Sequence, residues 1–327
     1  MSRSIGGVRS VQEVIPDWLA PIIALFTQLG DIWFLVLLLA VLYWKRSATQ
    51  EKVMVVGGML TAGIGIYRSL KYIFGLPRPD EPLLEPELVP WIIRPLYELT
   101  AFSSSYGFPS GHATISTIVY FGLAEILDVG SRRLRYLCAA VLVAFIGLTR
   151  IILGLHFLVD IIVGIGLGAT ILFVGFRGVG RISRDHITVL LFVAIVLNTL
   201  YLFTSDADIE AAIMFGAALG LFGGWQLILL ARELVAVSRP SRAAKPLLVR
   251  GGLALVTRGP LIVALEDFPL LSGETPPAVG AAGIVIAVLV IIPVARYSKR
   301  LRTVFASLSF WTHALTDWLR RRIRNLR

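Results

Sequence analysis

Three short stretches of the chain concentrate residues suited to phosphoryl chemistry. Lys71 and Arg78 stand in the first, K-Y-I-F-G-L-P-R-P; His112 ends the second, G-F-P-S-G-H; and the third contains Arg150 and His156. Lysine and arginine cations that converge at one place bind phosphoryl oxygens, and arginine does so with two parallel hydrogen bonds. A histidine beside such a site can attack phosphorus or carry a proton. The residue types therefore predict phosphate binding and phosphoryl transfer.

The second stretch has the features of a helix start. Ser110 can cap the helix, Gly111 lets the backbone approach an anion closely, and the first-turn N–H groups attract negative charge. His112 would then face the same anion. A helix cap without any other role would explain Ser110, but it would not explain why a histidine follows in the first turn.

The third stretch pairs a histidine with a carboxylate. His156 and Asp160 are four residues apart and would share one face of a helix. Asp160 can accept a hydrogen bond from the N–H at Nδ1 of His156, which leaves the other ring nitrogen with a lone pair. A polar pair that only holds two helices together is the alternative. A single lysine or arginine at the end of a membrane span often only contacts lipid headgroups. Three such cations beside two histidines favour a phosphate-binding site instead.

The elements that carry these stretches are predicted to be membrane helices. Hydrophobic residues make up 56% of the chain, charged residues 16%, and the mean hydropathy is +0.79, beyond the range of a soluble domain. A helix needs about 20 apolar residues to cross a bilayer. We expect an all-α, polytopic membrane bundle with nine membrane segments, the first preceded by a bent stretch from Trp18. The segments are Ile32–Trp44, Val53–Phe74, His112–Leu127, Leu134–Ile152, Phe157–Phe176, Ile187–Phe203, Ile209–Leu230, Leu247–Leu265 and Val279–Val294.

The distribution of charge indicates orientation and excludes some functions. The net charge is +10, but the basic residues gather in alternate loops, which the positive-inside rule places in the cytoplasm. The three stretches then face the outside of the cell membrane. No soluble basic module supports nucleic-acid binding. The single cysteine, Cys138, excludes an intrachain disulfide and a cysteine metal cluster.

We predict three regions along the chain. Residues 1–186 form a catalytic membrane domain with five spans, residues 187–296 add four spans of unknown role, and residues 297–327 form a basic, amphipathic cytoplasmic tail. Glycines spaced by four, at Gly164 and Gly168 and again from Gly216 to Gly224, predict close helix contacts. The glycine rows also offer a surface for a homodimer.

The three stretches together resemble a known signature. The pattern K-x-x-x-x-x-x-R-P, P-S-G-H and S-R-x-x-x-x-x-H-x-x-x-D is similar to the tripartite motif of the phosphatidic acid phosphatase type 2 superfamily. This superfamily includes lipid phosphate phosphatases and vanadium haloperoxidases. The resemblance covers residues 30–175 with the order and spacing of the motifs intact. Thr149 stands where the family usually has serine, and it keeps the hydroxyl group.

The resemblance implies a haloperoxidase-like helical core and a role for each motif residue. His156 would attack phosphorus and form a phosphohistidine, Asp160 would orient it, and His112 would protonate the leaving oxygen and then activate water. The phosphoryl oxygens would be held by Lys71, Arg78, Ser110, Gly111 and Arg150. Neither a metal nor another cofactor is implied. The expected substrate is a lipid phosphate in the bilayer: polyprenyl pyrophosphate, phosphatidic acid or phosphatidylglycerophosphate.

Two other functions are compatible with the same residues. A lipid phosphotransferase would pass the phosphoryl group from the histidine to an acceptor other than water. A transporter or permease built on a phosphatase scaffold is the alternative from another class. Transport sites more often lie near the middle of the membrane, whereas the motif residues here are predicted at one interface.

Overall fold

The computed structural model describes residues 8–45, 49–79, 81–102, 105–179, 185–236, 243–255, 257 and 275–297. These residues form helices and connecting loops without a strand, which confirms the all-α prediction. The chain divides into two compact units, Met1–Phe215 and Gly216–Arg327. The basic tail predicted after residue 297 lies outside the described residues.

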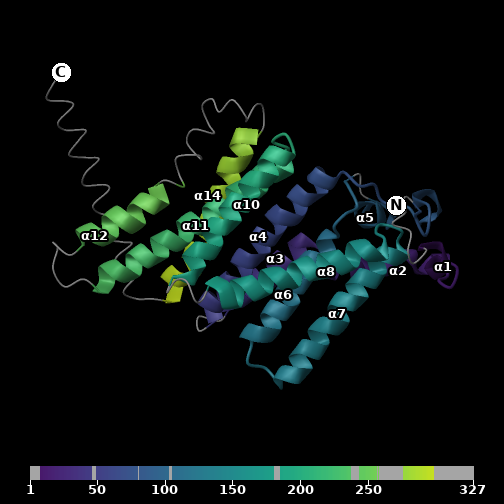
Figure 1. Cartoon of the computed structure of the whole chain (residues 1–327), viewed down its shortest axis with the longest axis horizontal. Coiled ribbons are helices and arrows are strands. Elements are labelled where there is room, and N and C mark those ends of the chain that lie inside the picture. Colours follow the sequence, from purple (N-terminus) through teal and green to yellow (C-terminus); the bar gives the residue numbers. More distant parts are fainter. Residues whose placement is uncertain are drawn as a thin grey trace. The chain divides into compact units, whose positions relative to one another are not determined.

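The first unit contains most of the helices (Figure 1). Its α-helices are α1 Val8–Gln12, α2 Ala20–Thr27, α3 Ile32–Lys45, α4 Gln50–Phe74, α5 Arg94–Ala101, α6 Gly111–Ile126, α7 Arg132–Ile152, α8 Leu158–Phe173 and α10 His186–Thr204. Short turns of other helix types are η1 Asp17–Leu19, η2 Gln28–Gly30, η4 Pro86–Leu88 and η5 Val174–Val179. Helix α11, Ile209–Ala236, begins in this unit, and the second unit continues with α12 Ala244–Pro246, η7 Leu247–Gly251 and α14 Thr275–Tyr297.

Five helices among the described residues are long and apolar enough to cross a membrane: Gln50–Phe74, Arg132–Ile152, Leu158–Gly178, His186–Thr204 and Ile209–Val235. They confirm five of the expected spans, and the chain is an integral membrane protein. The first expected span forms one half of a broken pair, Asp17–Gly30 and Ile32–Lys45, bent by 47°. Helix α6 has 16 residues, Pro277–Pro293 is also short, and much of the expected Leu247–Leu265 segment lies outside the described residues.

Helix α4 lies at the centre of the first unit and packs against α10, α6, α3 and α8. Its contact with α10 is close: a Cβ on Gly65 would lie 2.6 Å from the carbonyl carbon of Leu197. The buried Asn198 of α10 donates from its amide nitrogen to the carbonyl of Thr61 at 2.9 Å, which ties α10 to α4 inside the bundle. Helix α10 falls in the region that the sequence assigned to additional spans, and it packs here as part of the first unit.

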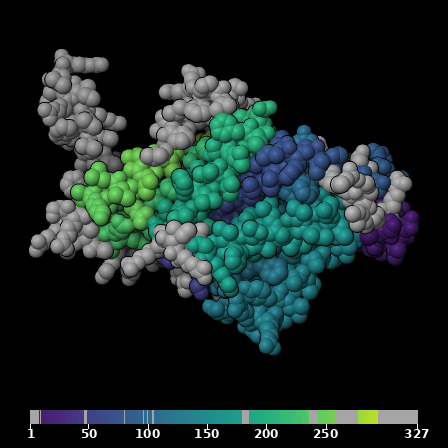
Figure 2. All heavy atoms as spheres, in the orientation of Figure 1, coloured from purple at the N-terminus to yellow at the C-terminus, as the bar shows by residue number. Residues whose placement is uncertain are grey.

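Small residues also bring α6 and α8 together. A Cβ on Gly164 would lie 2.6 Å from the carbonyl oxygen of Ser110, and one on Gly168 would lie 2.6 Å from that of Thr114. The backbone N–H of Ser110 donates to the carbonyl of Asp160 at 3.0 Å and fastens the two helix starts. In the space-filling view, side chains fill the spaces that the ribbons leave between α7 and α8 (Figure 2).

The second glycine row packs two helices of the second unit. Cβ atoms on Gly216 and Gly220 would each lie 2.3 Å from a carbonyl oxygen of α14, those of Val279 and Gly283. The contact repeats at the same interval of four residues on both helices, as expected for a small-residue interface in a membrane. These glycines therefore contact another helix of the same chain, and the homodimer stays a prediction.

Two glycines in left-handed conformation set the loops that bear site residues. Gly75, with φ of 58°, ends α4 and donates to the carbonyl of Lys71. Gly154, with φ of 71°, follows α7, and a Cβ there would lie 1.8 Å from the carbonyl oxygen of Glu81. Only glycine fits this conformation and contact without strain, so the turn before His156 depends on Gly154.

We expect Gly154→Ala to destabilise the protein by about 1–3 kcal/mol, because it combines left-handed backbone strain with a clash against backbone. Gly166→Ala on α8 is the matched control, since no atom lies within 4 Å of the added methyl group. Thermal unfolding in detergent, followed by circular dichroism, measures both. Equal midpoints for the two variants would contradict the role given to this turn.

Candidate active site

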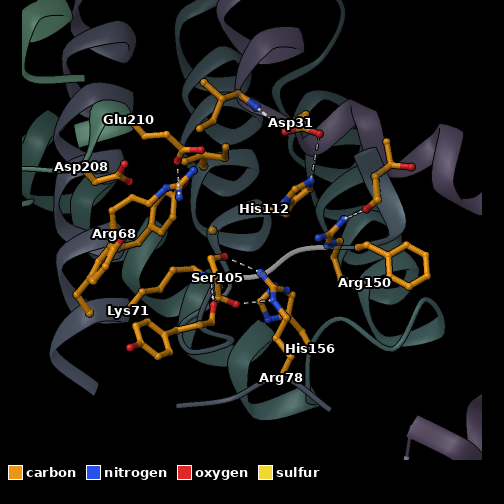
Figure 3. A pocket seen from close by; sticks show the side chains of 18 residues that line it. Asp31, Arg68, Lys71, Arg78, Ser105, His112, Arg150, His156, Asp208 and Glu210 are labelled. Carbon is orange, nitrogen blue, oxygen red and sulfur yellow. Dashed lines mark hydrogen bonds and ion pairs between the residues drawn. The ribbon is translucent and has the colours of Figure 1, made fainter. Parts of the chain in front are cut away.

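The ends of several helices enclose a cavity of about 620 Å³ in the first unit. The C-terminal ends of α4 and α7 and the N-terminal end of α6 meet there, with the loops that flank α5 and α8. Side chains predicted as site residues line this cavity: Lys71, Arg78, His112, Arg150 and His156, with Gly111 (Figure 3). Three stretches far apart in the sequence are thus brought to one place.

Two of the cations are held by oxygen atoms that carry no formal charge. Lys71 is 4% exposed and donates its ammonium group to the carbonyl of Tyr106. Arg150 is also 4% exposed and donates to the hydroxyl of Thr27 at 3.2 Å and to the carbonyl of Thr100 at 3.4 Å. Such partners satisfy hydrogen bonds but leave positive charge in the cavity, and that charge favours an anion.

Arg78 lies in the loop before α5, and its hydrogen bonds connect this loop to the loop after α5 and to the turn before α8. It donates to the carbonyl and the hydroxyl of Ser105, at 2.8 and 3.0 Å, and to the carbonyl of Leu155 at 2.9 Å. Its Nη1 lies 3.3 Å from Nε2 of His156. Burial lowers the pKa of Arg78 to about 10, so the guanidinium stays charged at neutral pH. This places a fixed positive charge beside the imidazole.

His156 is 1% exposed and lies in the turn between α7 and α8. Its Nδ1 is 3.5 Å from Oδ2 of Asp160, within ion-pair distance but outside hydrogen-bond geometry. The same carboxylate oxygen accepts from the backbone N–H of Phe157 at 3.0 Å. Burial, and next the charge of Arg78, hold the pKa of His156 well below its usual value. The imidazole is therefore neutral, with Nδ1 toward Asp160 and Nε2 toward Arg78.

His112, in the first turn of α6, is paired with an acid that the sequence reasoning missed. Its Nε2 lies 3.7 Å from Oδ2 of Asp31, at the break between η2 and α3. The other oxygen of Asp31 accepts from the N–H of Ile32 at 3.2 Å. A Cβ on Gly30 would lie 3.1 Å from the His112 ring, so the glycine permits the approach. The available signal was a lone acid inside an apolar stretch, which often marks a site in a membrane protein.

Other predicted residues lie next to the cavity rather than in its lining. The Ser110 hydroxyl accepts from the N–H of Ala113 at 3.4 Å, which confirms the helix cap, while the adjacent Gly111 faces the cavity. Asp160 stands behind His156. The hydroxyl of Thr149, in the family's serine position, donates to the carbonyl of Ile146 at 2.7 Å within its own helix.

The cavity supplies positive charge from side chains. Within the described part of the chain, no cluster of three or more histidine, cysteine or acidic residues could hold a metal ion. Three cations, one neutral histidine and a histidine–carboxylate pair can bind a phosphoryl group, attack it and move a proton. The expected absence of a metal stays a prediction.

Comparison with known families agrees with this geometry. Residues 52–184 match the family model of the PAP2 superfamily, and all three motif stretches lie inside the match. This part of the chain is similar to the PAP2 superfamily. The resemblance seen in the sequence is therefore confirmed.

One curated protein and one solved structure that are similar to the chain come from the same bacterium. Phosphatidylglycerophosphatase B of Bacillus subtilis (strain 168) is 31% identical over 129 residues, which cover 35% of this chain and 62% of that protein. The chain thus spans less than two thirds of the relative's length. The crystal structure of a transmembrane PAP2 type phosphatidylglycerolphosphate phosphatase from Bacillus subtilis is 23% identical, with a TM-score of 0.41, over 54% of this chain and 85% of that one.

The lowered pKa of His156 predicts how stability depends on pH. An imidazole whose pKa falls on folding binds a proton more readily in the unfolded chain. Its contribution to stability is full above the unfolded pKa of about 6.5 and is lost as the pH falls below it, by up to about 1.4 kcal/mol per unit. His156→Gln should flatten the fall in thermal stability between pH 6.5 and pH 5. Identical pH slopes for the wild-type and variant proteins would contradict the neutral, buried imidazole.

Proposed function

We propose that this protein is a membrane phosphatase that hydrolyses a lipid phosphate through a phosphohistidine intermediate, without a metal. The observation that carries the proposal is the convergence, in one cavity, of a neutral His156, an acid-paired His112 and three cations. The match of residues 52–184 to the family model of the PAP2 superfamily supports it.

The reaction has two steps. Lys71, Arg78 and Arg150 hold the phosphoryl oxygens while Nε2 of His156 attacks phosphorus and the bond to the lipid oxygen breaks. His112 gives its proton to that leaving oxygen, so a phosphomonoester leaves an alcohol and a pyrophosphate leaves a monophosphate. His112 then takes a proton from water, which attacks the phosphohistidine, and inorganic phosphate leaves. The cations stabilise the charge that moves onto the phosphoryl oxygens in both transition states.

The name of the Bacillus subtilis relative makes phosphatidylglycerophosphate the first substrate to test, beside phosphatidic acid and polyprenyl pyrophosphate. The basic residues of alternate loops support an active site that faces outside. A phosphotransferase would use the same first step and replace water by an acceptor hydroxyl in the second. A transporter built on this scaffold would bind the phosphate without turnover.

His156→Ala should abolish phosphate release from all three lipids, by at least ~10³-fold, because it removes the attacking nitrogen. His186→Ala, at the start of α10 and outside the cavity lining, is the matched control. Release is measured with the purified protein in detergent micelles. Activity in the His156→Ala protein near that of the control would rule out this nucleophile, and an inactive wild-type protein would favour the phosphotransferase or the transporter.

Asp31→Asn should lower kcat for lipid phosphates by ~10²-fold, because the amide no longer supports the charged form of His112 as the general acid. The loss should be smaller with p-nitrophenyl phosphate, whose leaving group needs little protonation. A merely structural role would reduce both substrates alike. Asp17→Asn, on η1 of the same bent pair, serves as the carboxylate-to-amide control.

A further inference from the structure

The cavity extends beyond the residues of the three motifs to a second polar region. Arg68, Asp208 and Glu210 line it there (Figure 3). Tyr67 and Tyr72 also line the cavity. Arg68 lies on α4 three residues before Lys71, about 4.5 Å along the helix axis. Asp208 and Glu210 come from the turn after α10 and the first turn of α11. We call Arg68, Asp208 and Glu210 the outer triad.

Arg68 has hydrogen-bond donors to spare. Its Nη1 lies 2.9 Å from a carboxylate oxygen of Glu210, and its Nε donates to the hydroxyl of Tyr67 at 3.2 Å. The guanidinium also lies over the rings of Tyr67 and Tyr201, at 5.8 and 6.0 Å from their centres. Arginine has five donors, and these contacts with described residues use two of them. Because Arg68 lines the cavity, the others can meet a bound group there.

The two acids provide acceptors at the same place. Asp208 and Glu210 line the cavity, and an ionised carboxylate only accepts hydrogen bonds. The outer triad therefore offers donors and acceptors side by side. A hydroxyl group both donates and accepts, so it matches such a set. A phosphate group only accepts when it is fully ionised, and it would meet two negative charges here.

We propose that the outer triad binds the free hydroxyls of a polyol joined to the scissile phosphate. The substrate class is then a phosphomonoester of a glycerol-like or sugar-like group, in preference to a diphosphate or a lipid phosphate without hydroxyls. The inference rests on the proposed function, whose catalytic residues stay as assigned. Lipid-borne and water-soluble polyol phosphates carry the same recognised chemistry.

The selectivity has two physical sources. A headgroup without hydroxyls leaves the donors and acceptors of the outer triad unpaired after it displaces water, and such a loss discriminates strongly between substrates. In a diphosphate the second phosphate takes the place of the hydroxyl-bearing carbons next to the scissile group. It brings like charge against Asp208 and Glu210, which discriminates by repulsion. The first effect acts against lipid phosphates without hydroxyls and the second against diphosphates. Substitutions in the outer triad can therefore separate them.

The test compares kcat/KM of the full-length protein in detergent micelles for four substrates. Phosphatidylglycerophosphate and glycerol 3-phosphate bear free hydroxyls on a lipid and on a soluble molecule; phosphatidic acid and polyprenyl pyrophosphate lack them. In Asp208→Asn and Glu210→Gln, the ratio of kcat/KM for phosphatidylglycerophosphate over phosphatidic acid should fall about tenfold, the effect of one hydrogen bond to a charged group. Glu210→Gln should also raise kcat/KM for polyprenyl pyrophosphate.

Asp206→Asn is the matched control, since Asp206 lies in the same turn but not in the cavity lining, and its ratio should equal that of the wild-type protein. If this ratio and kcat/KM for glycerol 3-phosphate were both unchanged in the two triad variants, the inference would be overturned. A wild-type preference for polyprenyl pyrophosphate would also overturn it. A fall in the glycerol 3-phosphate arm alone would assign the site to soluble polyol phosphates.

A binding measurement separates this inference from the catalytic one. Glycerol 3-phosphate is titrated calorimetrically into the His156→Ala protein with and without Asp208→Asn. A tenfold weaker affinity in the double variant supports the outer triad even if the wild-type protein releases no phosphate and the proposed hydrolysis fails. Equal affinities overturn the outer triad whatever the activity.

Discussion

The burial of like charges in one cavity is the constraint on which the rest of the site depends. Lys71 and Arg150 are almost completely buried, and Arg78 reaches the same space, so three cations have lost most of their water close to one another. Carbonyl and hydroxyl oxygens accept hydrogen bonds from these groups without cancelling their charge. A phosphoryl group cancels it with several oxygens at once. The cavity is therefore arranged for an anion before one arrives.

Such an arrangement persists only if the surrounding helices cannot relax. The glycine contacts supply that stiffness: α8 lies against the carbonyls of Ser110 and Thr114, and α4 lies against the backbone of α10 at Gly65. Backbone packed on backbone cannot shift by changing rotamers. The turn at Gly154 fixes His156 in the same way, because the loop at Glu81 occupies the space that a side chain would need. The positions of the candidate catalytic groups thus derive from main-chain contacts made by residues that do not themselves line the cavity.

The sequence allowed the motif residues and most membrane helices to be predicted, because residue type, spacing and apolar length carry that information. It was harder to predict which groups face the cavity and which helices are neighbours. Ser110 and Gly111 are neighbours, yet only the glycine faces the cavity, since the serine hydroxyl is used by the helix cap. The pairing of α10 with α4 also had no signal, as its apolar residues predict a helix but not its neighbour.

Asp31 and the outer triad were missed for a related reason. Each comes from outside the three motifs: the helix break at Gly30, the C-terminal part of α4, and the turn after α10 with the first turn of α11. Nothing in the spacing of these residues along the chain indicates that they meet, because that depends on a 47° bend and on the packing of α10. Charged residues inside or beside apolar segments were the only available indication.

The two histidine–carboxylate pairs make the proposed chemistry electrostatically consistent. When His156 forms its bond to phosphorus, its ring gains positive charge 3.5 Å from Asp160. When His112 gives up its proton, positive charge disappears 3.7 Å from Asp31. The total charge of the cavity changes little, so the three cations need not rearrange between the steps. Asp31, supplied by a broken helix outside the motifs, is thus as necessary to this balance as the Asp160 that the motif contains.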